Sequence, residues 1–251
     1  MNFPKSISFT ITNICNLRCQ MCGQWSKEGY MHARAGSGKD RLDNELTLAD
    51  WKRLVDELAE HQIPSVLLRG GEPFMHPDIM ELLQYINQKG IFLSIDTNGT
   101  MLKNYVHEIV ALGRVHLTIS VDGPEEIHDQ VRGVKGCFRR MKENVALLLE
   151  AEKSSGQTIS KSICFTISPY SYKGLGQMPD LARELGLKSI TIVPYYYVPE
   201  RLGKEYEREL NELSCPAFSW HGFHHEDSGV DAEIFLKEYR KFLAGLDGIY
   251  N

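Results

Sequence analysis

Three cysteines near the N-terminus are the residues of this chain best suited to chemistry. Cys15, Cys19 and Cys22 are separated by three residues and then by two. Three neighbouring thiols cannot pair completely as disulfides, but three thiolates can hold three corners of an iron–sulfur cube and leave the fourth iron open. An open iron is a place where chemistry can occur. Zinc is the alternative, although it usually takes four ligands with two-then-two spacing.

Polar, glycine-bearing segments recur further along the chain. In Arg69-Gly70-Gly71-Glu72-Pro73, two glycines let the backbone turn tightly against a ligand, and the carboxylate and nearby carbonyls can accept hydrogen bonds from an ammonium group. The alternative is a plain turn before a helix. The segments 96–100 (DTNGT) and 120–124 (SVDGP) are similar in kind, and Arg132 adds a cationic fork that suits a carboxylate.

Each of these segments follows an apolar run, and the apolar runs alternate with helical patterns. We expect strands at residues 6–12, 65–69, 91–95, 115–121, 162–168 and 189–193. We expect helices at 47–62, from Pro77 to a stop at Gly90, and at 105–112, 138–153, 178–185, 204–213 and 231–243. Thr47 with Asp50 three positions later predicts a cap for the first helix.

Six strand-then-helix units imply a parallel sheet with right-handed crossovers. Six units are too few for a standard eight-unit barrel, so the expected fold class is α/β, a partial (β/α)6 barrel of the TIM type. An open doubly wound sheet is the alternative. In both folds, active-site groups lie on the loops after the carboxyl ends of the strands. The cysteine loop and the polar segments should therefore share one mouth.

The composition of the chain argues against several classes of protein. The chain has 251 residues, enough for one large α/β domain or two small ones, and its net charge of −5 argues against a general nucleic-acid binder. No apolar run reaches membrane-spanning length, and the N-terminus does not read as a signal peptide. Six cysteines in a chain of this length do not indicate a secreted disulfide scaffold. We expect a cytoplasmic protein in a reducing environment, with no membrane or nucleic-acid partner.

The combined motifs resemble those of the radical S-adenosylmethionine (SAM) superfamily over about residues 6–200. Cys15, Cys19 and Cys22 match its cysteine signature, and Gly70–Pro73 matches its methionine-binding motif. The segments 97–99, 120–123 and 128–133 resemble the branch of peptide- and cofactor-modifying members, many of which carry a C-terminal SPASM or twitch extension. The resemblance implies a core barrel at 1–200 and a C-terminal helical segment at 201–251, and one of two open alternatives is that this segment leads to a SPASM or twitch extension.

The resemblance also implies roles for individual residues. The three cysteines would hold a [4Fe-4S] cluster whose free iron is chelated by the amino and carboxylate groups of SAM. Gly71 and Glu72, within the Gly70–Pro73 motif, would receive the SAM ammonium. Ser120 and Arg132 would face its carboxylate. Asn98 and Asp122 would lie near its methionine or ribose part.

The reaction implied is reductive cleavage of SAM to methionine and a 5′-deoxyadenosyl radical, which takes a hydrogen atom from a substrate. A peptide or protein side chain is the expected substrate, and the alternative is a small molecule such as a sugar, nucleotide or cofactor precursor. A non-catalytic iron–sulfur electron carrier is the hypothesis from another class. An electron donor such as flavodoxin or ferredoxin is an expected partner. The sequence identifies no catalytic acid or base.

The chain departs from the family pattern in two places. Met21 occupies a position that is commonly aromatic, although methionine can fill that space with a soft sulfur contact. SPASM-type extensions carry further cysteines, whereas only Cys215 follows residue 193 here. Either the subfamily has no auxiliary cluster, or the chain is a core cut before its extension.

Several other residues are candidates for lesser roles. Cys164 is expected in the core, and Cys137 in front of a helix. The histidines at 221, 224 and 225 are expected in a solvated or channel-lining loop rather than at a second metal. At least one of the tyrosines at 195–197 is expected in the mouth, with plain aromatic packing as the alternative. The long polar insertion 24–44 is expected to act as a substrate lid.

Overall fold

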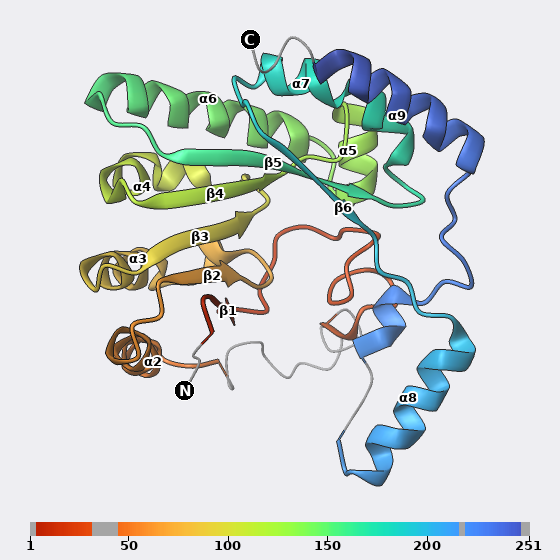
Figure 1. The fold of residues 1–251 in the computed structure, drawn as a ribbon, viewed down its shortest axis with the longest axis horizontal. Coiled ribbons are helices and arrows are strands. Elements are labelled where there is room, and N and C mark those ends of the chain that lie inside the picture. The colour runs from red at the N-terminus through yellow and green to blue at the C-terminus, as the bar shows by residue number, and fades with distance from the viewer. Residues whose placement is uncertain (1–3, 32–44, 216–218, 247–251) are drawn as a thin grey trace.

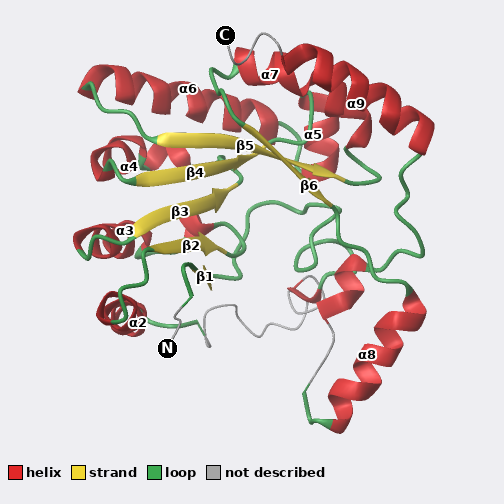
Figure 2. Ribbon diagram, viewed as in Figure 1, coloured by secondary structure: helices red, strands yellow, loops and turns green. Residues whose placement is uncertain are grey.

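A six-stranded parallel sheet forms the centre of the computed structural model, which describes residues 4–31, 45–215 and 219–246 (Figures 1 and 2). Its strands follow one another in chain order. They are β1 (Ile7–Thr10), β2 (Ser65–Arg69), β3 (Phe92–Thr97), β4 (Val115–Ser120), β5 (Ser160–Ile167) and β6 (Ile190–Pro194). All six strands were expected from the sequence, and so was their parallel pairing.

The strand order decides between the two expected folds. A doubly wound sheet reverses direction part-way and so places helices on both faces. Here each right-handed crossover moves one strand further in the same direction, so the crossover helices stay on one face. Figure 1 shows α2, α3, α4 and α6 stacked along that face. The fold is therefore a partial TIM-type barrel, as predicted.

The described helices also follow the predicted sequence of units. They are α2 (Leu48–Glu60), α3 (Ile79–Gln88), α4 (Val106–Leu112), α5 (Glu125–Arg132), α6 (Cys137–Ser155), α7 (Met178–Glu184), α8 (Glu200–Glu212) and α9 (Ala232–Leu246). Thr47 and Asp50 form the predicted capping box at the start of α2. Within the described ranges, no helix combines the length and the apolar character needed to cross a membrane.

One helix was not expected, and several helix boundaries differ from the expectation by a few residues. Residues 125–132 were expected as loop but form α5, a short helix with only Ile127 and Val131 as apolar residues. The helix expected from Pro77 begins at Ile79, after the short 3-10 helix η1 (Pro73–Met75). The helix expected from residue 204 begins at Glu200, directly after Pro199.

The two faces of the sheet differ in chemistry. Along β4, Val115, Leu117 and Ile119 are fully buried in the main hydrophobic core with residues of α3, α4 and α6. The alternate residues His116, Thr118 and Ser120 are only half-buried. Parallel sheets that are covered on both faces usually read as continuous apolar runs. The alternation seen here indicates that the second face lines a polar interior.

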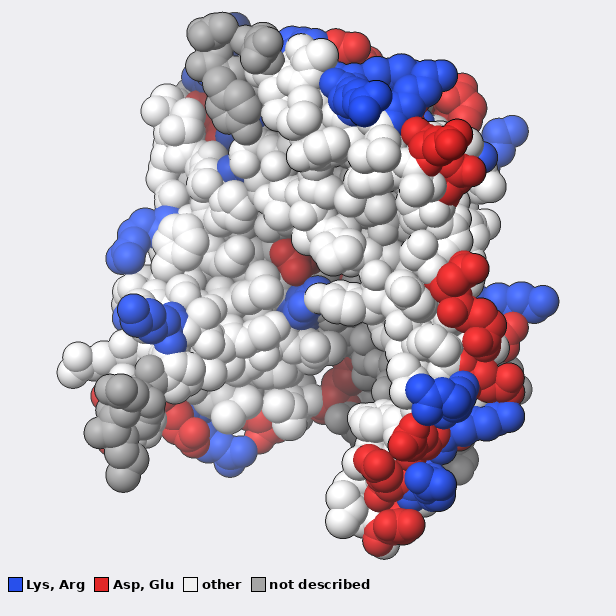
Figure 3. All heavy atoms as spheres, turned by 45° about the vertical axis from the view of Figure 1, so that its right-hand side comes forward, with Lys and Arg blue, Asp and Glu red and all other residues white. Residues whose placement is uncertain are grey.

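The C-terminal elements extend beyond the sheet. In Figure 1, α8 projects from the body of the molecule, whereas α9 lies beside α7. Only Gly203 of α8 is buried, and a Cβ at that position would lie 2.3 Å from the Trp220 ring, so this glycine lets the ring pack against the helix. Figure 3 shows acidic and basic side chains gathered along α8.

Candidate cofactor site at the mouth of the barrel

The cysteine loop follows β1 and is fixed on both sides by backbone hydrogen bonds. Gly71 N donates to Thr12 O at 2.7 Å, and Glu72 N donates to Ile14 O at 2.7 Å. On the other side, Arg18 N donates to Arg132 O at 3.0 Å, and Gln20 N donates to Val131 O at 2.8 Å. The loop is therefore held between the segment after β2 and the end of α5.

Two glycines make this close approach possible. A Cβ at Gly71 would lie 2.1 Å from Ile14 O, and a Cβ at Gly133 would lie 2.2 Å from Arg18 O. Both distances are far shorter than any van der Waals contact. The glycine at 71, singled out from the sequence for a close approach to a ligand, also allows the close approach of the cysteine loop.

The three cysteine sulfurs lie in a setting that favours bound thiolates. Cys15 Sγ accepts a hydrogen bond from Leu17 N at 3.4 Å, and Cys22 Sγ accepts one from Trp25 N at 3.4 Å. Arg132 Nη1 lies 3.8 Å from Cys19 Sγ. Burial raises the pKa of the Cys15 thiol to about 12 and that of Cys19 to about 11, so without a metal both stay protonated.

The spacing of the sulfurs argues against zinc. A tetrahedral zinc with Zn–S bonds of ~2.3 Å would hold its sulfurs roughly 3.8 Å apart. Among the described residues, the three cysteines are not a group whose ligand atoms all lie within 4.8 Å of one another. Sulfurs that each bind a different iron of a cube need no such closeness. The donor set therefore fits an iron–sulfur cluster.

Glu72 joins the segments after β2 and β3. Its Oε1 accepts hydrogen bonds from Thr97 Oγ1 at 2.7 Å and Phe74 N at 3.3 Å, and its Oε2 accepts one from Asn98 N at 2.7 Å. The side chain is 1% exposed, and burial raises the pKa of its carboxyl to about 7. One acceptor position on Oε2 is left for a further donor.

Asn98 reaches back to the cysteine loop. Its Nδ2 donates to Asn16 Oδ1 at 3.0 Å, and Asn16 Nδ2 donates to Thr100 Oγ1 at 2.8 Å. Asn98 Oδ1 in turn accepts from Thr100 N at 2.9 Å. The predicted site residue Asn98 is thus joined by side-chain hydrogen bonds to the loop between the first two cysteines.

A buried ion pair lies on the opposite side of the cysteine loop. Arg132 Nε donates to Asp122 Oδ2 at 2.6 Å, and Asp122 is fully buried. Asp122 N donates to His128 Nδ1 at 3.2 Å. Burial, aided by the nearby Arg132 charge, lowers the pKa of His128 to about 3, so the ring is neutral. Ser120 ends β4 on the polar face of the sheet.

The family can now be stated from sequence comparison. The sequence profile described as "Radical SAM superfamily" matches residues 9–169, well over half of the chain and all of the site described above. The chain belongs to the radical SAM superfamily. Its members pair a [4Fe-4S] cluster with SAM, so the family and the cofactors expected from the motifs are confirmed.

Relatives of this radical SAM chain carry out more than one kind of reaction. An AdoMet-dependent heme synthase of Methanosarcina barkeri (strain Fusaro / DSM 804) is 31% identical over 206 residues, which is 81% of this chain and 54% of that protein. The sporulation killing factor maturation protein SkfB of Bacillus subtilis (strain 168) is 31% identical over 149 residues, which is 59% of this chain and 33% of that protein. The chain thus spans about half or less of the length of these relatives.

Solved structures agree on the radical SAM fold. Streptococcus suis SuiB bound to S-adenosylmethionine matches with a TM-score of 0.63 at 20% identity, over 84% of this chain and 47% of that one. SuiB bound to the precursor peptide SuiA matches with a TM-score of 0.62 at 21% identity, over 84% and 45%. At these identities, the likeness concerns the fold alone.

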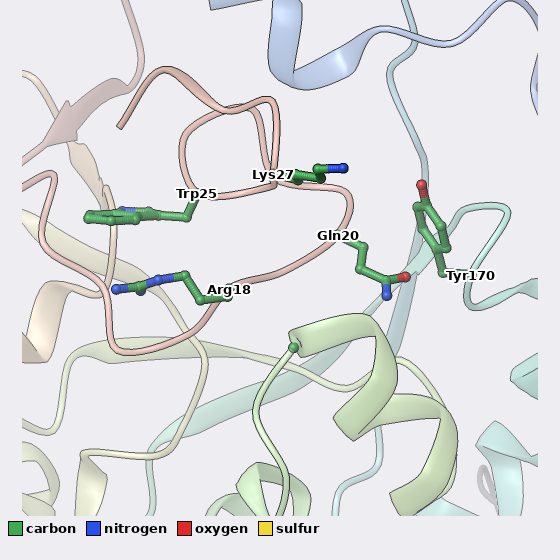
Figure 4. A pocket seen from close by; sticks show the side chains of 6 residues that line it. Arg18, Gln20, Trp25, Lys27 and Tyr170 are labelled. Atoms are coloured by element: carbon green, nitrogen blue, oxygen red, sulfur yellow. The ribbon is translucent and has the colours of Figure 1, made fainter. Parts of the chain in front are cut away.

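A cavity that the sequence did not reveal lies beside the cysteine loop of this radical SAM core. It is open to the surface and has a volume of about 320 Å³, and its lining residues are Arg18, Gln20, Trp25, Lys27, Gly133 and Tyr170 (Figure 4). The Arg18 guanidinium carbon lies 4.2 Å from the centroid of the Trp25 ring. The only sequence signal for this cavity was the pair of cations Arg18 and Lys27 on either side of Cys22. Nothing in the sequence indicates that Tyr170 lies beside them.

The structure also locates the lesser candidates. Tyr195 turns inward, with a buried hydroxyl that has no hydrogen-bond partner among the described residues, whereas Tyr196 is 75% exposed. Cys164 was expected in the core, but it is half-buried on β5, paired with Ser120 and outside the hydrophobic core. Cys137, expected in front of a helix, is buried as the first residue of α6. Residues 32–44 of the predicted substrate lid lie outside the described residues.

The histidine-rich segment pairs with carboxylates and aromatic rings. His224 Nε2 lies 3.3 Å from Glu226 Oε1, and this pair forms an exposed group with Glu200. Glu200 already pairs with Lys204 at 2.6 Å. His225 packs against the rings of Tyr170 and Tyr195. His221 was expected in a loop but lies in the short 3-10 helix η4 (Ser219–Phe223), and His224 follows it. That the segment is not a second metal site stays a prediction.

Proposed function

We propose that this chain is the catalytic core of an enzyme that takes a hydrogen atom from a peptide side chain, using the radical generated from SAM. When bound, the reduced [4Fe-4S] cluster supplies the electron that breaks the sulfonium C–S bond and yields methionine and the 5′-deoxyadenosyl radical. The main observation that supports the proposal is that backbone hydrogen bonds hold the cysteine loop on two sides. Its hydrogen bonds to residues 71–72 and to residues 131–132 gather the cysteines and the polar segments at one mouth.

The chain's own residues bind and orient the cofactors in this proposal. Cys15, Cys19 and Cys22 hold three irons. The free acceptor position of Glu72 and the carbonyls of Gly70 and Gly71 accept hydrogen bonds from the SAM ammonium, and Pro73 ends this turn by starting η1.

The SAM carboxylate is assigned to Ser120 and Arg132, beside Asn98 and Asp122. Asp122 occupies the Nε side of the Arg132 guanidinium, which leaves N–H groups of its terminal nitrogens for the SAM carboxylate. Asn98 and Asp122 then border the methionine or ribose part. Because Asp122 and Arg132 are fixed by their own ion pair, the carboxylate meets a donor that is already oriented.

A peptide is the proposed substrate, and a heme precursor is the second candidate. The maturation protein SkfB and the SuiB structure with its precursor peptide support the first. The AdoMet-dependent heme synthase, whose match spans a larger share of this chain, favours the second.

The test of the chemistry is anaerobic. The protein is reconstituted with iron and sulfide, reduced with dithionite and given SAM, and 5′-deoxyadenosine is quantified. We expect product from the wild type and from Cys215→Ala, which changes an exposed cysteine after α8, and none from Cys19→Ala. Absence of product from a wild type with a full cluster would refute the proposal.

The test of the substrate compares two probes in that assay. Synthetic peptides for short reading frames beside the gene are offered in one arm, and iron coproporphyrin III in the other. A mass loss of hydrogen or a new cross-link in a peptide supports the first candidate. Conversion of the porphyrin alone supports the second.

A further inference from the structure

We propose that the cavity beside the cysteine loop receives an acidic side chain of the protein that delivers the electron to the cluster. This inference rests on the proposed function, because an electron donor is needed only if the cluster is reduced during turnover. The cavity is lined by four residues of the cysteine loop and its continuation, by Gly133 and by Tyr170 (Figure 4); the four are Arg18, Gln20, Trp25 and Lys27.

The charge of the cavity favours an acidic group. Its six lining residues include the cations Arg18 and Lys27 and no carboxylate. Lys27 is exposed and forms no ion pair with any described residue, and Glu28, which follows it, does not line the cavity. The whole chain carries a net charge of −5, so a cavity lined by two cations and no carboxylate differs in sign from the chain as a whole and favours an acidic partner.

Two uncharged side chains of the cavity, Gln20 and Tyr170, can also form hydrogen bonds with a ligand. Gln20 Oε1 is buried and has no hydrogen-bond partner among the described residues. The amide of Gln20 also carries two N–H donors, the kind of group that binds a carboxylate. The Tyr170 hydroxyl has only a long contact of 3.4 Å to His225 Nε2 and can also donate.

The lining residues are bonded directly to the residues that carry the cluster ligands. Arg18 and Gln20 flank Cys19, and Arg18 Nη1 donates to Cys15 O at 3.0 Å. Trp25 N donates to Cys22 Sγ at 3.4 Å. A donor seated at this cavity is therefore a few bonds from the three thiolates, and electron transfer is fast only over short distances.

The position of the cavity argues against a substrate pocket. None of its lining residues is among those assigned to SAM, which are residues 70–73, Asn98, Ser120, Asp122 and Arg132. A substrate must lie against the SAM methylene carbon, whereas a reductant needs only the cluster. About 320 Å³ is near the lower end of the size of ligand sites.

The experiment compares two reductants. Lys27→Glu is measured beside Lys188→Glu, which makes the same charge change on an exposed residue at the opposite end of the sheet, just before β6. SAM cleavage is driven either by dithionite, which needs no docking, or by bacterial flavodoxin with its reductase. We expect Lys27→Glu to raise the flavodoxin concentration for half-maximal rate by about fivefold or more.

The controls define the remaining outcomes. With dithionite, all three proteins should have the same rate within about twofold, and Lys188→Glu should match the wild type with flavodoxin. Added salt should weaken flavodoxin-driven turnover of the wild type more than that of Lys27→Glu. An unchanged flavodoxin response in Lys27→Glu, or an equal loss with both reductants, would overturn the docking inference.

Failure of the proposed function is recognised separately. If the wild type with a full cluster does not cleave SAM with dithionite, the reaction proposal fails. The docking inference is then decided by calorimetric titration of the cluster-loaded protein with flavodoxin. Weaker binding by Lys27→Glu than by Lys188→Glu supports it, and equal or absent binding overturns it.

Discussion

Arg132 Nε lies 2.6 Å from Asp122 Oδ2, and Nη1 of the same guanidinium lies 3.8 Å from Cys19 Sγ. One buried cation therefore connects a carboxylate after β4 with the middle cysteine of the loop after β1. The Arg132 carbonyl also accepts a hydrogen bond from Arg18 N at 3.0 Å. The side chain and the backbone of one residue thus position the same loop.

Asp122→Asn should destabilise the protein strongly, because it leaves the Arg132 charge buried without its counterion. Breaking a buried pair from one side costs about 3 kcal/mol or more. Urea unfolding of the metal-free protein under reducing conditions measures this loss. Asp180→Asn breaks the exposed pair with Arg183 and should change the free energy of unfolding by less than about 1 kcal/mol. Equal effects of the two substitutions would contradict the buried pair.

Gly133→Ala should impair cluster assembly, whereas Gly156→Ala should not. Both glycines end helices, α5 and α6, with a φ of 70°. Alanine at either position costs roughly 1–2 kcal/mol for the left-handed backbone. Only at 133 would the new Cβ press on Arg18 O, at 2.2 Å; at 156 it meets nothing within 4 Å. Iron and sulfide content after reconstitution should fall for Gly133→Ala alone.

Glu72→Gln should weaken SAM binding and lower stability. The carboxylate accepts from three donors, and a glutamine amide must turn its N–H₂ group toward at least one of them. A buried N–H group that faces another donor is left without an acceptor, which lowers the free energy of unfolding by about 1–3 kcal/mol. We expect about a tenfold loss of SAM affinity by equilibrium dialysis of the cluster-loaded protein. Glu143→Gln, on α6, is the surface control, and wild-type affinity in Glu72→Gln would argue against the assignment.

His128 should make the metal-free protein sensitive to acid. The pKa of its ring falls from an ordinary value of 6.5 to about 3 in the folded state because of burial, so protonation favours the unfolded state. The stabilising effect of the neutral ring is present above pH 6.5 and is lost as the pH falls toward 3. Between pH 7 and pH 5 the wild type should lose about 2 kcal/mol through this group.

The matched variant for this prediction is His128→Asn. Asparagine cannot be protonated in this range, and its side-chain oxygen can accept the Asp122 N–H that His128 Nδ1 accepts. Urea unfolding at pH 7 and pH 5 should therefore show a smaller acid loss in His128→Asn than in the wild type. Parallel pH dependence in both proteins would show that His128 is not the cause.

Most of the fold could be predicted because each unit carries a separate local signal. Apolar runs such as residues 115–121 and the cap at Thr47 need no long-range information. Helix α5 was missed because Ile127 and Val131 alone make no clear apolar stripe. This helix matters for the site, because α5 carries Arg132 and the end of α5 holds the cysteine loop through backbone hydrogen bonds.

The motif residues could be named from the sequence, but their mutual contacts could not. The bonds from Glu72 to Thr97 and Asn98 cross from one unit to the next, and the pairing of Asp122 with Arg132 depends on the unrecognised helix. The cavity could not be predicted either, because it depends on contacts between segments that are far apart in the sequence. It requires Tyr170, after β5, to stand against Gln20, and sequence spacing does not fix that distance.

The order of the strands divides the molecule into two parts with different freedom to change. Every residue assigned to the cluster or to SAM lies between Cys15 and Arg132, within the first four strand–helix units. The units of β5 and β6 and the helices α8 and α9 supply no residue assigned to the cluster or to SAM. Sequence changes in the later half of such a chain can therefore alter which substrates bind, while the residues assigned to the cluster and to SAM stay the same.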